Sequence, residues 1–302
     1  MTASGDRPSV LCFGEALWDV LPDRRIPGGA PMNVAVRLAR YGIDTRLLSR
    51  VGRDAGGDAL LDYLSRAGLP PEYVQRDDTW PTGTVRVDTS NPAAVRYTIE
   101  QPVAWDFIDA DQYLQAAGEA VDVIVFGSLA ARHDVSRRSL LTLLERARLK
   151  VLDVNLRPPF DDPETVHTLL DRADWAKVND DELRSVAPGV HAAAPVEELA
   201  RVVQESYGLT SLCVTLGGKG ALLLVRDEVY RQSAYDVRVV DTVGCGDAFL
   251  ATWLGGMLER VGPADALERA AAVAALVASS EGATGRFDAA DIRRLVESQR
   301  AR

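Results

Sequence analysis

Cysteine, histidine and aromatic residues are scarce in this chain. Of 302 residues, three are cysteine, three are histidine and 6% are aromatic. The cysteines are widely separated and odd in number, which excludes a disulfide framework or a CxxC metal site and predicts reduced thiols. The histidines, His133, His167 and His191, lack the spacing of metal ligands. We expect them to be surface or loop residues.

Excess positive charge and long apolar segments are also missing. The net charge is −10, and no run of Lys or Arg predicts a nucleic-acid footprint. No stretch reaches the length of a bilayer span, and residues 1–8 lack the apolar centre of a signal peptide. We therefore expect a cytoplasmic protein with no nucleic-acid and no membrane partner. An acidic protein that binds phosphate must do so locally, through amides, a few cations and metal.

What the chain does have is an alternation of apolar and amphipathic segments. Short apolar runs such as 121–126 and 151–154 are typical of strands buried on both faces. Amphipathic segments between such runs predict a mainly parallel sheet covered by helices on both faces, an α/β fold. The expected strands are 10–14, 45–51, 121–126, 151–154, 175–178, 212–215, 221–225, 228–231 and 237–240. The expected helices are 31–41, 57–67, 136–148, 163–173, 180–186, 195–207, 247–260 and 264–280.

One region departs from this alternation. Residues 82–89 and 94–100 indicate two strands joined by Ser90-Asn91-Pro92, and 17–21 indicates a further strand of the same kind. A small antiparallel element that grows from an α/β core can serve as a lid, which excludes water during group transfer. A solvent-facing hairpin without a functional role is the alternative.

The most informative segment is 241–249, Asp-Thr-Val-Gly-Cys-Gly-Asp-Ala-Phe. A β-branched stretch runs into closely spaced glycines, an acid and an apolar helical run, which predicts a strand, a tight turn and a helix N-terminus. The amides of Gly244, Cys245 and Gly246 can then converge on an anion such as phosphate. Asp247 would take a proton from a hydroxyl while these amides stabilise a transferring phosphoryl group. An ordinary N-cap aspartate is the alternative.

Cys245 is the one cysteine near this chemistry. A helix N-terminus lowers the pKa of a thiol, which would favour a reactive thiolate. No histidine lies near it in the sequence, however, so we do not expect a catalytic thiol.

A second segment, Gly28-Gly29-Ala30-Pro31-Met32-Asn33, precedes an apolar helical run. Two glycines let the backbone approach a ligand closely, and Asn33 can both donate and accept hydrogen bonds with sugar hydroxyls. The segment is not a dinucleotide-binding fingerprint, because the third glycine and the preceding strand are missing. No segment matches a Walker-type loop either.

Together, the two segments resemble the signatures of the ribokinase-like carbohydrate kinases, the PfkB family. Residues 28–42 are similar to the N-terminal signature and 241–249 to the C-terminal one, and the resemblance extends from Val10 to about Phe287. Residues 14–19, 102–106 and 153–158 are most similar to bacterial fructokinases.

The resemblance implies a single ribokinase-like domain over residues 1–302. It would have a three-layer α/β/α core with a mainly parallel sheet and a small β-sheet lid. The lid would be built from about 16–27 and 80–104, and a homodimer would form through it.

The resemblance also implies a role for individual residues. Asp247 would be the catalytic base that receives the sugar hydroxyl proton. The anion hole for the γ-phosphoryl group would be Gly244, Cys245 and Gly246. The residues that hold the sugar would be Asp19, Gly29, Asn33 and Arg157. Those at the nucleotide would be Asn179, Thr215, Gly217 and Gly220, and those that place Mg²⁺ through its water shell would be Asn179 and Glu182.

Each of these residues has a structural alternative. Asn179 and Glu182 could cap the helix that follows them. Residues 217–220 could be a plain hairpin turn, Asp19 a solvated strand residue and Arg157 a salt-bridge partner.

Two segments depart from the wider family. Residues 126–129, Phe-Gly-Ser-Leu, lack the acid that the ribose-specific branch places there, which agrees with the fructokinase branch. Residues 278–284 replace a more apolar loop that often helps bind a monovalent cation, so dependence on K⁺ is left open. Trp18 and Trp105 could wall the sugar site or pack in the core or the lid.

The sequence therefore predicts an ATP-dependent sugar kinase that uses Mg²⁺, with D-fructose as the first acceptor. Kinases for 2-keto-3-deoxygluconate, ribose or a nucleoside, and a non-catalytic sugar-binding regulator, remain alternatives. The sequence leaves open the hydroxyl that is phosphorylated, the choice between ATP and GTP and the oligomeric state.

Overall fold

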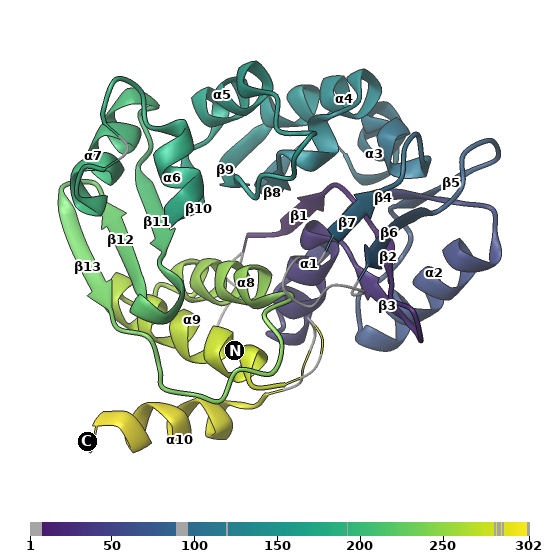
Figure 1. Ribbon diagram of the computed structural model, residues 1–302. Coiled ribbons are helices and arrows are strands. Elements are labelled where there is room, and N and C mark those ends of the chain that lie inside the picture. Colours follow the sequence, from purple (N-terminus) through teal and green to yellow (C-terminus); the bar gives the residue numbers. More distant parts are fainter. Residues whose placement is uncertain are drawn as a thin grey trace, which may run out of the picture.

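A computed structural model describes residues 8–88, 96–118, 120–191, 193–280, 282, 285 and 287–300 (Figure 1). The strands are β1 (Val10–Phe13), β2 (Leu17–Val20), β3 (Arg25–Gly28), β4 (Thr45–Gly52), β5 (Val74–Asp77), β6 (Gly83–Asp88), β7 (Arg96–Ile99), β8 (Val121–Gly127), β9 (Ala147–Asp153), β10 (Trp175–Asn179), β11 (Ser211–Thr215), β12 (Ala221–Val225) and β13 (Glu228–Gln232). The α-helices are α1 (Ala30–Arg40), α2 (Ala55–Ala67), α3 (Ala110–Ala117), α4 (Asp134–Leu144), α5 (Pro163–Arg172), α6 (Asp180–Val186), α7 (Val196–Ser206), α8 (Cys245–Leu258), α9 (Pro263–Ala278) and α10 (Ala289–Arg300). Short 3₁₀ helices are η1 (Ala104–Phe107), η2 (Leu129–Ala131) and η3 (Gly217–Lys219).

The large sheet is mainly parallel, as predicted. Within the described residues its strand order is β13-β12-β11-β10-β9-β8-β1-β4-β5. The strands from β11 to β5 run parallel, and β12 and β13 extend one edge antiparallel. The chain winds from β1 to β4 and β5 on one side, and later from β8 to β11 on the other. Sheets wound in two directions bind ligands at the carboxyl ends of the strands, where the direction changes. Here that point lies between β1 and β8.

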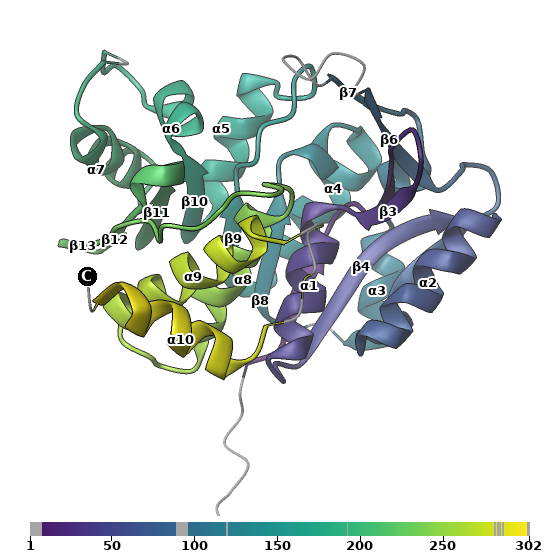
Figure 2. The ribbon, with the colours of Figure 1, turned by 60° about the horizontal axis from the view of Figure 1, so that its bottom comes forward.

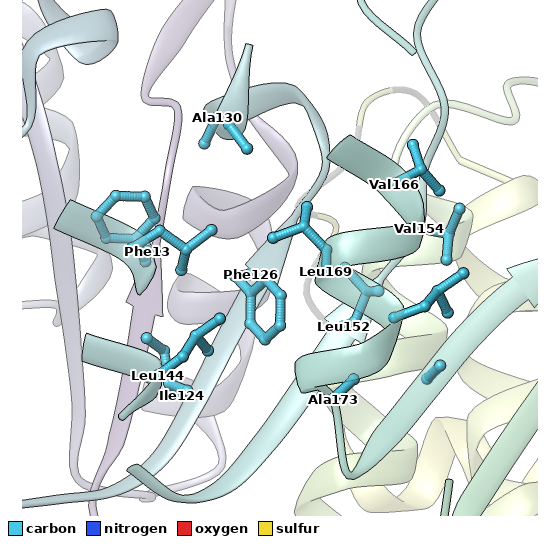
Figure 3. Packing of buried hydrophobic residues seen from close by; sticks show 14 of the residues in the cluster. Phe13, Ile124, Phe126, Ala130, Leu144, Leu152, Val154, Val166, Leu169 and Ala173 are labelled. Atoms are coloured by element: carbon cyan, nitrogen blue, oxygen red, sulfur yellow. The ribbon is translucent and has the colours of Figure 1, made fainter. Parts of the chain in front are cut away.

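Helices cover both faces of this sheet, which confirms the predicted three layers (Figures 1 and 2). Alternate strand residues point to opposite faces. Phe13, Phe126 and Leu152 belong to a core cluster that includes side chains of α4, α5, α6 and α7 (Figure 3). Their strand neighbours Cys12 and Val125 belong to a second cluster with α1, α2, α8 and α9.

A small separate sheet has the order β3-β2-β6-β7. The strands predicted at 17–21, 82–89 and 94–100 correspond to β2, β6 and β7, and β3 completes the sheet. It is not wholly antiparallel, because β2 and β6 pair in parallel. The predicted connection through Ser90-Asn91-Pro92 lies outside the described residues.

Trp18 and Trp105 both pack inside the protein. The indole N–H of Trp18 donates to the carbonyl oxygen of Gly56 at 3.0 Å, and the side chain is 8% exposed. Trp105 is fully buried, and the guanidinium of Arg132 lies 3.8 Å from its ring centroid. Of the two alternatives for Trp105, a wall of the sugar site or packing in the interior, the structure therefore supports packing.

One predicted element is wrong, and another is wrong at its carboxyl end. Residues 237–240 do not form a strand, and Val239 and Val240 are 62% and 54% exposed, so their β-branched side chains have no sheet to pack on. The helix predicted over 136–148 ends at Leu144. Its last residues enter β9 instead, because Ala147 pairs with the first residue of β8 and tertiary pairing outweighs helical periodicity there.

None of the described helices has both the length and the apolar composition that a bilayer span requires.

Phe126 provides a test of the core. The side chain is 1% exposed and lies in the cluster of Figure 3. We expect Phe126→Ala to lower the free energy of unfolding by about 3–5 kcal/mol, because it removes apolar contacts and leaves a cavity. Val240→Ala, at an exposed position, should change it by no more than about 0.5 kcal/mol. Urea unfolding followed by circular dichroism measures both. Equal losses in the two variants would contradict this packing.

Candidate active site

The two signature segments meet in the structure. Asp247 stands in the first turn of α8 and is half-buried, and Asn33 stands in the first turn of α1. The side-chain amide of Asn33 donates to Oδ2 of Asp247 at 2.8 Å. The N-cap of α8 is Gly244, whose φ of 76° is left-handed. Asp247 is therefore not the N-cap residue, and that alternative is wrong.

The carboxyl of Asp247 is unusually basic. Burial raises its pKa to about 6, and the nearby carboxylate of Asp153 acts in the same direction. The hydrogen bond from Asn33 and the charges of Lys177 and Arg157 act to lower it. A carboxylate with a raised pKa is a better proton acceptor than an ordinary aspartate.

The predicted anion-binding turn lies at the positive end of α8. The amide of Cys245 donates back to the carbonyl oxygen of Thr242 at 3.3 Å, so one of the three predicted donors is engaged within the turn. The amides of Gly246 and Asp247 belong to the first helical turn, where no intrahelical acceptor precedes them. An anion can accept hydrogen bonds from such groups.

Cys245 does not have the lowered pKa expected at a helix N-terminus. Burial raises the pKa of its thiol to about 11, and the carboxylates of Asp241 and Asp247 act in the same direction. Cys245 therefore stays a thiol at neutral pH.

The predicted sugar loop passes very close to β1 and β2. A Cβ on Gly29, which has a φ of 110°, would lie 2.3 Å from the carbonyl oxygen of Glu15. A Cβ on Gly28 would lie 2.3 Å from Oδ2 of Asp19. Glycine is therefore required at Gly29, where backbone blocks a side chain, whereas a side chain at position 28 would have to displace the carboxyl of Asp19.

Asp19 is not a freely solvated strand residue. It is half-buried on β2, and burial raises the pKa of its carboxyl to about 6, with Asp247 acting in the same direction. The charge of Arg157 acts to lower it. Asp19, Asp247 and Arg157 are thus close enough to influence one another, as a shared acceptor site requires.

Glu15 is a candidate that the sequence prediction missed. It is 4% exposed, and Oε1 accepts a hydrogen bond from the amide of Ala30 at 3.2 Å. Oε2 is buried and has no hydrogen-bond partner among the described residues. Burial raises the pKa of Glu15 to about 7. The sequence does contain a signal for Glu15, because this acid directly follows a buried strand and Gly14.

Arg157 lies on an exposed loop after β9. The amide of the preceding residue, Leu156, donates to Oε1 of Glu182 at 3.0 Å, which fixes the loop to the start of α6. The charge of Arg157 acts to lower the pKa of Glu15 and of Asp247. The guanidinium is therefore placed to act on the carboxyls of the site.

Asn179 and Glu182 form the capping box that the sequence offered as an alternative. Oδ1 of Asn179 accepts from the amide of Glu182, and Oε2 of Glu182 accepts from the amide of Asn179, both at 2.8 Å. Glu182 is 5% exposed, and its pKa is raised by burial and by the charge of Asp153. The capping role is real, and it holds a carboxylate at the carboxyl edge of the sheet.

A cavity of about 280 Å³ lies beside the turn of α8. Its lining includes all three residues predicted on the nucleotide loop, together with two from the turn: Thr215, Gly217, Gly220, Cys245 and Gly246. One wall is an apolar stripe on α9: Ala271, Ala274, Ala275 and Ala278. An apolar slot next to an anion-binding turn fits a planar base with attached phosphates.

The loop over 217–220 is also the hairpin turn that the sequence offered as an alternative. It contains η3 and joins the antiparallel strands β11 and β12. Asn179 is the register partner of Thr215 in the neighbouring strand, so the predicted nucleotide residues are close together.

An ion pair near this turn was also missed from the sequence. Nζ of Lys177 lies 2.8 Å from Oδ1 of Asp153, and both side chains are buried. Oδ2 of Asp153 is buried without a hydrogen-bond partner among the described residues. A lysine within the mostly apolar strand β10 and an aspartate at the end of the buried run 151–153 were the signal that could have found the pair.

The donor set suits a metal that keeps its water shell. No cluster of three or more His, Cys, Asp or Glu side chains in the described part of the chain could hold a metal directly. The unpartnered oxygen of Asp153 and the carboxylate of Glu182 instead offer acceptors for the water shell of a hard cation such as Mg²⁺.

The three histidines have local roles. Nδ1 of His133 accepts from the amide of Val135 at the start of α4, and Nδ1 of His191 accepts from the amide of Ala193. His167 contacts the hydroxyl of Tyr207. None acts as a ligand in a metal cluster of the described residues.

Several known proteins are similar to this chain in sequence and fold. A fructokinase from Klebsiella pneumoniae is 31% identical over 264 residues, which cover 82% of this chain and 84% of that protein. The structure of a fructokinase from Vibrio cholerae O395 with fructose, ADP and calcium ion bound has a TM-score of 0.84 and 25% identity, and the match covers 96% of this chain and 99% of that one.

The same fold occurs in an aminoimidazole riboside kinase from Salmonella enterica, complexed with aminoimidazole riboside and an ATP analog. The TM-score is 0.80 at 22% identity, over 95% of this chain and 99% of that one. The model of the pfkB family carbohydrate kinases matches residues 9–290. This chain belongs to the pfkB family of carbohydrate kinases.

Proposed function

We propose that this protein is an ATP-dependent fructokinase, which transfers the γ-phosphoryl group of ATP to a hydroxyl of D-fructose. One observation carries the proposal: the half-buried carboxylate of Asp247, held by Asn33, stands between the sugar loop and the nucleotide cavity. The 31% identity to the Klebsiella pneumoniae fructokinase supports the choice of sugar.

In the proposed reaction, Asp247 accepts the proton of the sugar hydroxyl. The hydroxyl oxygen forms a bond to the γ-phosphorus, and the bond from that phosphorus to the β,γ-bridging oxygen breaks, which releases ADP. The amides at the start of α8 stabilise charge on the transferring group. Because the transition state of phosphoryl transfer is loose, positioning and charge stabilisation carry most of the catalysis.

Asn179 and Glu182 are proposed to place Mg²⁺ through its water shell, with Asp153 as a further acceptor. Mg²⁺ supplies positive charge at the phosphates of the nucleotide. Glu182 accepts hydrogen bonds from the backbone amides of Leu156 and Asn179. These two bonds hold the loop of Arg157 and the end of β10 in place.

The charges of the acceptor site favour a neutral sugar over a sugar acid. Glu15, Asp19 and Asp247 supply three carboxyls, whereas the compensating charges are those of Arg157 and of Lys177, which is already paired with Asp153. A carboxylate substrate such as 2-keto-3-deoxygluconate would add negative charge to a half-buried site of low polarisability. Fructose carries no such charge.

The small sheet is proposed as the lid of a single kinase domain. It joins the large sheet through the segments that carry Glu15, Asp19 and the sugar loop. Its outer strands β3 and β7 each have one paired neighbour among the described residues, so a second copy could pair there to form a homodimer. Sedimentation analysis of the chain would test the dimer.

The direct test is ADP formation from Mg²⁺-ATP with fructose, ribose, 2-keto-3-deoxygluconate and adenosine in parallel, with and without K⁺. We expect turnover with fructose to exceed that with the other acceptors. Faster turnover with another acceptor would retain the kinase and replace the sugar. Fructose binding by calorimetry without ADP formation from any acceptor would indicate a non-catalytic sugar-binding regulator.

Asp247→Asn tests the proposed base. We expect kcat to fall by about 10²–10⁴-fold, because the amide cannot accept the proton, while the affinity for fructose stays near that of the parent chain. Asp265→Asn is the matched control, since Asp265 is an exposed acid in the first turn of α9. Retention of the parent kcat in Asp247→Asn would remove Asp247 from its role.

The pH profile tests the same group differently. Asp247 must be ionised to accept a proton, and its pKa is raised to about 6. We therefore expect kcat to fall as the pH drops through about 6, rather than near 4 as for an ordinary aspartate. Asp19 has a similar pKa, so the profile of Asp19→Asn is the control and should keep this acidic limb. A parent profile that is flat down to pH 5 would contradict the assignment.

A further inference from the structure

The buried ion pair of Lys177 and Asp153 lies between the sheet and α8. The two residues are register partners on the parallel strands β10 and β9. Trp175, two residues before Lys177, packs against Trp253 of α8 with ring centroids 5.6 Å apart. Because alternate residues of a strand share a face, Lys177 also points toward the layer that contains α8.

The ammonium of Lys177 reaches the anion-binding turn. A Cβ built on Gly246 would lie 3.3 Å from Nζ and 3.7 Å from Cε of Lys177. Gly246 also borders the nucleotide cavity. The positive charge therefore lies close to a residue that borders this cavity.

Carboxylates surround this ammonium. Burial by itself lowers the pKa of Lys177, but the charges of Asp153 and Glu182 outweigh burial and raise it, and Asp247 acts in the same direction. Asp153 accepts a hydrogen bond from Nζ, and an ammonium has three N–H donors, so the capacity of Lys177 for a further anion is not exhausted by this pair.

We propose that Lys177 is a positioning residue for phosphoryl transfer. Its buried ammonium supplies positive charge to the turn at Gly246 when the γ-phosphoryl group binds there, and Asp153 holds the ammonium in place beneath that turn. This inference rests on the proposed kinase function. A merely structural ion pair, by contrast, could be exchanged for uncharged residues without an effect on catalysis.

The test separates charge from packing. Lys177→Met alone leaves the carboxylate of Asp153 buried and unpaired, which should lower the thermal midpoint strongly. The double variant Lys177→Gln/Asp153→Asn removes both charges and retains side chains that can bond to each other. We expect its thermal midpoint to return to within about 4 °C of the parent chain.

The readouts are kcat, the KM for the sugar and the affinities for ATP and adenosine by calorimetry. Asp153→Asn alone removes the same carboxylate and keeps Lys177, so it is the reference for the double variant. We expect the double variant to lose kcat by about 10²-fold relative to Asp153→Asn, a loss typical of removing one electrostatic group from a transition state. ATP affinity should fall about tenfold, a change of about 1.4 kcal/mol. The sugar KM and the affinity for adenosine, which has no phosphate, should stay near their parent values.

A matched control lies on the same two strands. Lys150 of β9 and Asp174, just before β10, form an ion pair of 3.0 Å at the opposite end from the turn. Lys150→Gln/Asp174→Asn should keep the parent kcat and ATP affinity.

The inference is overturned if the double variant has a thermal midpoint near that of the parent chain and also keeps the parent kcat and ATP affinity. If that variant does not fold, Lys177→Met/Asp153→Asn carries the same test in a differently packed pair. Turnover of the parent chain in the acceptor panel tests the kinase function separately. The ATP-binding comparison requires no turnover, so it tests Lys177 whatever the panel shows.

Discussion

Carboxyl groups from four separate segments gather at the carboxyl edge of one sheet: Glu15, Asp153, Glu182 and Asp247. Removing charged carboxyls from water costs several kcal/mol each unless partners compensate. Here the partners are backbone amides, the side-chain amide of Asn33 and the ammonium of Lys177. Burial that is not fully compensated raises the pKa values of Glu15, Glu182 and Asp247, which suits a site that must accept a proton and attract cations.

The topology explains why this edge holds the site. Parallel strands end at the same edge, so residues that directly follow β1, β9 and β10 lie close together although they are far apart in the chain. α8 brings its positive end and Asp247 to this edge, and α1 brings Asn33. The small sheet begins directly after β1, with β2 and β3, and the sugar loop follows β3. The sugar loop therefore lies at the same edge as the turn before α8, where Asn33 bonds to Asp247.

Several structural alternatives turned out to be compatible with a role in the site. The box of Asn179 and Glu182 caps α6 and also holds a carboxylate at the strand ends. The turn at 217–220 closes a hairpin and also lines the cavity. Backbone groups that must be satisfied at a helix start or in a tight turn are therefore used again to hold the residues proposed to bind ligands. A local motif alone does not separate the two roles.

The sequence by itself determined the α/β class, the parallel core and the two signature segments, because these depend on local periodicity, glycine spacing and a helix start. The sequence failed at 237–240 and at 145–148, where only the position of neighbouring strands decides whether a segment pairs. The tertiary structure alone decided that Asn33 bonds to Asp247, that Glu15 is buried and that Lys177 pairs with Asp153. Each of these is a contact between segments distant in the chain, and the pKa values that follow depend on burial, which no local pattern encodes.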